Sequence, residues 1–185
     1  MSFRSYLSKY LYLALYPLIF MGSAFPAFGE TILNRTQAGS LDNGWTLAES
    51  ADGKFSVKLP CLFNDLTTTS IATMPVDKAF TLGCVDSEGV RFTAIRTVYR
   101  QQGYALSLFS KCEKSEGLPG KVMPANKLDY MGFKTLDIAL MDETFLLLRV
   151  ILVGEDLVML TKEAKPFDLP PIANTSIFFD SLKLQ

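Results

Sequence analysis

Residues 134–162 read KTLDIALMDETFLLLRVILVGEDLVMLTK. This stretch predicts three consecutive β-strands, at 134–141, 144–153 and 157–162. Short acidic turns separate the runs, and turns of this length join antiparallel neighbours. The middle run is apolar on both faces apart from Arg149, which is typical of a central strand that is covered on both sides. The stretch therefore predicts the buried centre of an antiparallel sheet.

Alternating patterns upstream add strands to this sheet. Two β-hairpins are predicted, 45–50 with 54–59 and 79–85 with 90–99. Apolar residues then recur at helical spacing from Tyr104 to Glu116, and Gly117 follows as a C-cap candidate. The closing segment 172–184 reads as a short helix. Strands dominate and at least one helix covers a face, so the expected fold is α+β, with an antiparallel sheet of about six to seven strands covered by helices.

The first 29 residues differ from the rest of the chain. They carry two basic residues and no acidic residue, an apolar run at 10–21, and small residues at Ala27 and Gly29. These features are typical of a secretory signal peptide that is cleaved after Gly29. An uncleaved anchor helix is the alternative, although the run is short for a membrane span and Pro17 interrupts it.

The rest of the chain divides into a tether and a domain. Residues 30–43 lack a sustained apolar period and are expected to form the tether, and residues 44–185 are expected to form a single α+β domain. No later apolar run is long enough to cross a membrane. We therefore expect an exported protein, periplasmic or secreted, with no membrane span after signal cleavage.

Composition excludes several classes of function. The 185 residues carry 18 Lys+Arg against 19 Asp+Glu, a net charge of −1, and no His. A chain so nearly neutral is not expected to bind nucleic acid. Without His there is no Ser-His-Asp triad, no Cys-His pair and no His-ligated zinc. Glycine-rich phosphate loops and calcium-loop spacings are also missing, so we expect no cofactor, no metal site and no catalytic residues.

Four short motifs suggest a family: DGKFSVKLP at 52–60, RVILVG at 149–154, LVML at 157–160 and FFDSLKL at 178–184. Their order along residues 44–185 resembles the PsbP-like class of small bacterial exported proteins. That class shares its fold with the PsbP subunit of photosystem II and the Ran-binding Mog proteins. The resemblance implies an α/β/α sandwich around an antiparallel sheet. It implies no reaction, because members of this fold mostly act as accessory or binding proteins. Fold alone does not determine function.

Three cysteines, Cys61, Cys84 and Cys112, are widely spaced and form no C-x-x-C motif. In an oxidising compartment two of the three are expected to form a structural disulfide. Cys61 and Cys84 lie near strand ends and are the predicted pair. Cys112 falls on the apolar face of the predicted helix with Leu108, and we expect it to be a buried thiol. A redox-responsive protein, the alternative, would need an exposed Cys112 with a low pKa.

Arg149 stands out because it interrupts an apolar strand. In one interpretation it forms a buried ion pair within the domain, and in the other it anchors an anionic ligand. The hairpin turn brings Asp137 within about a residue of direct opposition to Arg149. A change of register by one residue decides whether the two side chains share a face.

Other acidic residues gather in turns, at Asp86/Glu88, Asp142/Glu143 and Glu155/Asp156. Two carboxylates that converged in a pocket would allow a hydrolase. The absence of His leaves few other routes to a general base near neutral pH. We therefore expect a non-enzymatic accessory or binding protein of the cell envelope, whose partner is an envelope protein or a small apolar ligand. A carboxylate-dependent hydrolase and a redox-responsive thiol protein are the alternatives.

Overall fold

The computed structural model describes residues 28–37, 44–70, 75–118, 120–123, 125–141, 144–164 and 172–185. Most of the expected signal peptide, residues 1–27, lies outside this described part. So do residues 38–43 of the expected tether and the acidic turn at 142–143.

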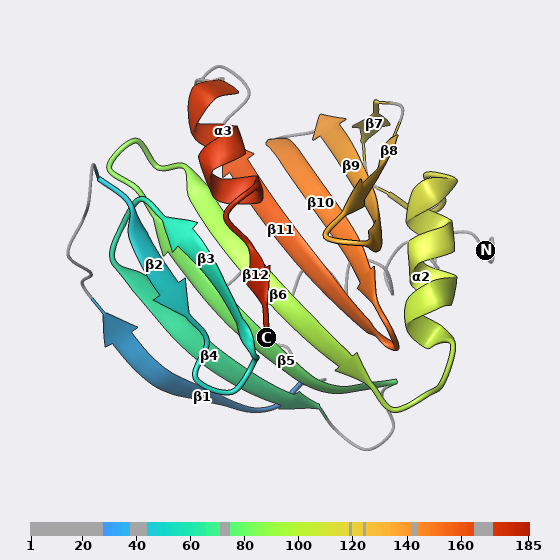
Figure 1. The fold of residues 1–185 in the computed structure, drawn as a ribbon, viewed down its shortest axis with the longest axis horizontal. Helices are drawn as coiled ribbons and strands as arrows, with labels where there is room; N and C mark the ends of the chain where they lie inside the picture. Colours follow the sequence, from blue (N-terminus) through green and yellow to red (C-terminus); the bar gives the residue numbers. More distant parts are fainter. Residues whose placement is uncertain are drawn as a thin grey trace, which may run out of the picture.

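The described residues form one large antiparallel sheet of nine strands (Figure 1). Eight follow one another across the sheet in the order β1 (Phe28–Gln37), β4 (Phe63–Ser70), β5 (Val76–Val85), β6 (Arg91–Tyr99), β11 (Asp156–Ala164), β10 (Phe145–Val153), β9 (Phe133–Met141) and β7 (Lys121–Val122). The ninth, β8 (Asn126–Tyr130), also pairs with β9. Strand β10 lies between β9 and β11, as its apolar sequence predicts.

A second, three-stranded sheet packs on one face of the first (Figure 1). It consists of β2 (Thr46–Glu49), β3 (Phe55–Leu59) and β12 (Lys183–Leu184), with β3 in the middle. The pairing of β2 with β3 confirms the first predicted hairpin. Gly53 in its turn has no room for a side chain, because an added Cβ would lie 2.6 Å from a ring carbon of Phe55. The turn is therefore packed directly onto the core.

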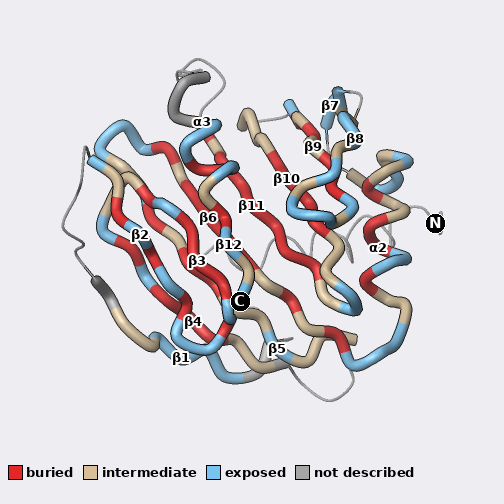
Figure 2. Tube along the Cα trace, in the orientation of Figure 1, coloured by how far each residue is buried: buried red, intermediate tan, exposed pale blue. Residues whose placement is uncertain are grey.

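Two apolar clusters lie on opposite faces of the large sheet, because neighbouring residues of a strand alternate between its faces. Val158 and Leu160 of β11 belong to one cluster, and Leu157 and Met159 belong to the other. Helix α2 (Tyr104–Glu113) covers the second cluster, whereas helix α3 (Ile172–Phe179) and the small sheet cover the first. Buried residues accordingly run along β10 and β11 and along one side of α2 (Figure 2).

The expected antiparallel sheet with helices on its faces is confirmed, but its details differ. The sheet has nine strands rather than six to seven. One face is covered by a helix together with a second sheet, so the expected α/β/α sandwich holds only in part. Helix α2 also ends earlier than predicted, at Glu113, and Ser115 after it adopts the left-handed conformation with φ 58°.

Strand β1 is the largest difference from expectation, because residues 30–37 were expected to form a tether. It pairs along its length with β4, although its side chains show no apolar alternation. Ile32 and Leu33 are both about half exposed. Polar contacts hold the strand instead: Asn34 and Arg35 both reach Asp65 of β4, which is fully buried. A strand held by backbone pairing and polar contacts lacks the hydrophobic period on which sequence prediction depends.

Candidate functional site

Arg149 is the centre of a polar cluster that joins strands β9 and β10 to the end of α3. It lies on β10 directly opposite Asp137 of β9, so the two side chains share a face of the sheet. That face is the one that α3 covers. The Arg149 side chain is only 9% exposed, whereas that of Asp137 is 36% exposed.

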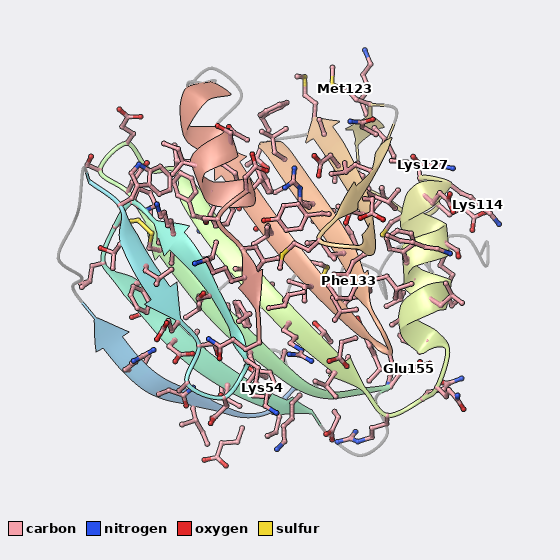
Figure 3. The ribbon with its side chains drawn as sticks, viewed as in Figure 1. Lys54, Lys114, Met123, Lys127, Phe133 and Glu155 are labelled. Atoms are coloured by element: carbon pink, nitrogen blue, oxygen red, sulfur yellow. A yellow bond between two sulfur atoms is a disulfide. The ribbon has the colours of Figure 1, made fainter. Side chains whose placement is uncertain are left out.

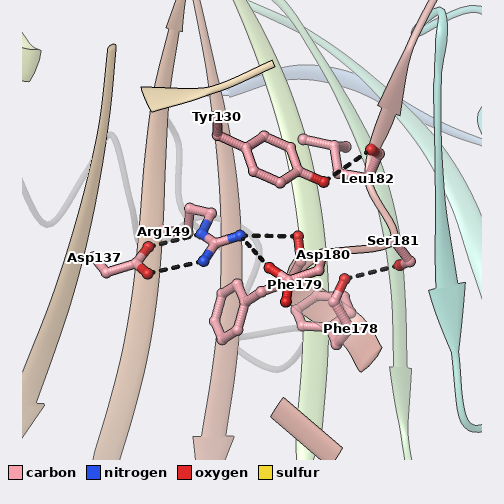
Figure 4. A network of polar contacts seen from close by, with 8 residues as sticks. All are labelled: Tyr130, Asp137, Arg149, Phe178, Phe179, Asp180, Ser181 and Leu182. Carbon is pink, nitrogen blue, oxygen red and sulfur yellow. Dashed lines mark hydrogen bonds and ion pairs between the residues drawn. The ribbon is translucent and has the colours of Figure 1, made fainter. Parts of the chain in front are cut away.

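Four hydrogen bonds hold the guanidinium (Figure 4). Arg149 Nε and Nη2 donate to the two carboxylate oxygens of Asp137 at 2.7 and 2.8 Å. Nη1 donates to Asp180 Oδ1 at 2.9 Å and to the carbonyl oxygen of Phe179 at 3.2 Å. The bidentate pairing with Asp137 is the strong geometry for an arginine and a carboxylate. The structure thus brings Arg149 and Asp137 together and adds a second carboxylate, Asp180.

Two aromatic rings flank the same guanidinium. Its central carbon lies 5.1 Å from the ring centre of Tyr130 and 5.2 Å from that of Phe179, both within cation–π range. The Tyr130 hydroxyl in turn donates to the carbonyl oxygen of Leu182 at 3.1 Å. Burial lowers the pKa of Arg149, but its hydrogen bonds and charge interactions with the two carboxylates outweigh this, so the pKa is raised overall. The arginine therefore stays charged.

The cluster fixes the end of α3. The last carbonyls of a helix lack partners within it and attract cations. Arg149 satisfies the carbonyl of Phe179, and Ser181 Oγ donates to that of Phe178 at 2.8 Å. Ser181 Oγ also accepts from the backbone N–H of Lys58 on β3. Arg149 and Ser181 therefore join the large sheet, the small sheet and the C-terminal segment.

An open groove of about 520 Å³ lies beside this cluster. Its lining combines apolar side chains with the ion cluster: Met123, Asp137, Ile138, Ala139, Leu147, Leu148, Arg149, Thr175, Ser176, Phe179 and Asp180. The groove thus lies between α3 and strands β9 and β10. Met123, at one end beside β7, is half exposed, and its backbone N–H donates to the carbonyl of Ala139 (Figure 3).

Asp137 and Asp180 line one groove, which is the arrangement that a carboxylate hydrolase would need. A glycosidase, however, places its substrate between the two carboxylates. Here the guanidinium of Arg149 occupies that space, since the carboxylates bind its opposite sides. The two carboxylates therefore bind and stabilise an arginine between them.

The turn acids have structural partners as well. Asp86 Oδ1 accepts from the backbone N–H groups of Glu88 and Val90 within its own turn. Asp156 forms two hydrogen bonds with Arg96, at 2.8 and 2.9 Å. Glu155, beside the start of α2, accepts from the N–H of Gly103 at 2.7 Å (Figure 3). These contacts order turns and the beginning of a helix.

Cys61 and Cys84 form a disulfide, as predicted, with their Cα atoms 5.9 Å apart. Cys112 is the free cysteine, and it is 4% exposed on the inner side of α2. Burial raises the pKa of the Cys112 thiol to about 11. A protonated, buried thiol is a poor nucleophile, so the property that a redox-responsive Cys112 would need is missing.

Sequence reasoning missed Asp180, Tyr130 and Lys162. Asp180 and Tyr130 are distant in sequence from Arg149, and no local pattern links them. Lys162 lies in an apolar strand, as Arg149 does, and this interruption could have singled it out. It is 1% exposed, its Nζ lies 3.0 Å from the hydroxyl of Thr175 and 5.5 Å from the ring centre of Phe92, and burial lowers its pKa.

Within the described residues, no group of three or more Asp, Glu or Cys residues could hold a metal ion. No helix in the described part of the chain combines the length and apolar character that crossing a membrane requires.

No family model and no curated protein matches the chain. Among solved structures, it is similar to the solution structure of cyanobacterial PsbP (CyanoP) from Synechocystis, at 13% sequence identity with a TM-score of 0.47. The match covers 82% of this chain and 99% of that chain. This similarity concerns the fold alone.

Proposed function

We propose that the protein is a non-enzymatic binding protein of the cell envelope, and that the groove between α3 and strands β9 and β10 is its binding site. The observation that carries this proposal is the lining of the groove. Apolar side chains form most of the lining, and its charged groups are already bound to one another. Small-molecule sites are typically concave and apolar, have a few placed polar groups, and occupy about 300–1,000 Å³.

The environments of the reactive groups support binding over catalysis. The carboxylates of the groove bind Arg149, and the Cys112 thiol is buried with a raised pKa. Export to the envelope is supported by the signal-like composition of residues 1–29 and by the disulfide, since disulfides persist in oxidising compartments.

The site can be tested by NMR with 1-octanol as a neutral apolar probe. We expect amide chemical shifts to change at Ala139, Leu147 and Ser176 and to saturate as octanol is added. In an Ala139→Phe variant, the new ring fills the groove at β9 and should abolish these changes. Ala51→Phe, the same substitution in the exposed turn of the small sheet, should leave them intact.

Two results would refute the proposed site. One is the absence of saturable shift changes in the parent protein. The other is a set of changes that persists in Ala139→Phe, because the probe would then bind elsewhere. A folded Ala139→Phe protein, judged by its dispersed amide spectrum, is required for the comparison. Ala139→Met is a smaller replacement that narrows the groove if the phenylalanine variant does not fold.

A further inference from the structure

We propose that the groove selects a small molecule with an alkyl chain and an ammonium group, and this inference rests on the proposed binding function. The charges that line the groove differ from those that a ligand can reach. Three charged side chains line it, those of Asp137, Arg149 and Asp180. Their exposed fractions differ greatly.

The cationic member of the cluster is the buried one. The Arg149 side chain is 9% exposed, and its N–H groups donate to protein oxygens on both sides. The carboxylates are the accessible members, with Asp137 36% and Asp180 59% exposed. An incoming ligand therefore meets carboxylate oxygens, whereas four of the five N–H donors of the buried guanidinium already bind protein oxygens.

Lys162 does not make the groove attractive to an anion. Its ammonium lies near the groove, but the residue is 1% exposed and its Nζ lies 3.0 Å from the hydroxyl of Thr175. It is absent from the groove lining, whereas Thr175 is part of it. Arg149 and Lys162 thus lie beneath the surface, whereas Asp137 and Asp180 are accessible.

The exposed acceptors and the apolar lining together define the ligand class. A charged donor bound to a carboxylate forms a stronger hydrogen bond than a neutral one does. Ala139, Leu147 and Phe179 lie close to the carboxylates in the same groove and offer an aliphatic chain an apolar surface. A primary alkylammonium combines both features: its head would lie at Asp180 and its chain along β9 and β10.

The experiment compares three probes that share an eight-carbon chain: octylammonium, 1-octanol and octanoate. Dissociation constants come from the same NMR titration at pH 7 and low salt. We expect octylammonium to bind roughly tenfold more tightly than octanol, which corresponds to one charge-assisted contact, and octanoate to bind most weakly. Added salt should reduce the advantage of octylammonium, because it screens an exposed charge pair.

A matched pair of variants tests whether Asp180 causes the preference for octylammonium. Asp180→Asn removes the more exposed carboxylate, and it should reduce the affinity for octylammonium several-fold while leaving that for octanol within about twofold. Asp52→Asn removes an exposed carboxylate from the turn of the small sheet and should change neither affinity.

The outcomes separate this inference from the proposed function. Saturable octanol binding with no preference for octylammonium would overturn the charge selectivity and leave the binding site in place. Tighter binding of octanoate would also overturn it, because Arg149 would then act as an anion anchor. If none of the three probes changed the groove amides, both the selectivity and the proposed function would be refuted.

Discussion

Replacing Arg149 by methionine tests the role of the ion cluster in stability. Methionine keeps an unbranched stem of similar length, so the main loss is the guanidinium with its four hydrogen bonds. Asp137 and Asp180 would then face each other as like charges, and the carbonyl of Phe179 would lose its partner. We expect the folded state to be destabilised even though a charged residue has been replaced by an apolar one.

The expected loss in the free energy of unfolding depends on how deeply the charged groups are buried. Removing one partner of a fully buried ion pair costs about 3–5 kcal/mol. Here the remaining carboxylates are 36% and 59% exposed and can recover water, so the cost must be lower than for buried charges. We expect the free energy of unfolding to fall by about 2–3 kcal/mol. Asp180→Asn should cost less, about 1 kcal/mol or below, because Asp180 is the more exposed partner.

Urea unfolding followed by circular dichroism, with the disulfide intact, measures the change. With a slope of about 2 kcal/mol per M, the midpoint of Arg149→Met should fall by about 1–1.5 M. Arg100→Met is the matched control, because Arg100 pairs with Asp77 at the surface, where the two side chains are 35% and 42% exposed. That variant should stay within about 1 kcal/mol of the parent.

Equal stability of Arg149→Met and the parent would refute the reasoning. It would mean that the desolvation cost of the guanidinium cancels its hydrogen bonds, as apolar replacements of some buried ion pairs have shown. A loss as small as that of Arg100→Met would lead to the same conclusion.

Three further predictions concern other parts of the fold. The Cys61→Ala/Cys84→Ala double variant should lose about 3 kcal/mol in urea unfolding, because the disulfide closes a loop with a sequence separation of 23. Burial raises the pKa of Cys112 from 9.0 to about 11, so the folded state retains a proton that the unfolded thiol releases. The free energy of unfolding should therefore fall as pH rises from about 9 to 11. Cys112→Ala should make this decrease smaller. Gly53→Ala should cost about 1–3 kcal/mol, because its Cβ would lie 2.6 Å from the ring of Phe55, and a thermal midpoint equal to that of the parent would contradict this.

The sequence could predict the strands that carry an alternating or fully apolar pattern. Residues 134–162 predict the three strands β9, β10 and β11, and the structure pairs them in that order. Strands β1 and β8 were missed because they pair at or near sheet edges, where few side chains need to be apolar. The disulfide was predicted because Cys61 and Cys84 lie near strand ends, and the pairing of β4 with β5 brings these ends together.

The contacts of the candidate site were likewise predictable from the sequence only in part. The position of Arg149 in an apolar strand and its nearness to Asp137 across a hairpin are local facts, which periodicity and turn position reveal. Asp180 and Tyr130 come from segments that neither precede nor follow β10 directly, and only the packing of α3 and β8 over the sheet brings them to the guanidinium.

Hydrophobic patterning therefore determined the central strands, the helices and the hairpin that holds the ion pair, because backbone periodicity reports which face of an element is buried. Tertiary structure alone decided that the arginine is enclosed by two carboxylates and two rings, and that a groove lies beside them. Long-range contacts of this kind depend on the relative placement of separate elements, and no local pattern of residues encodes that placement.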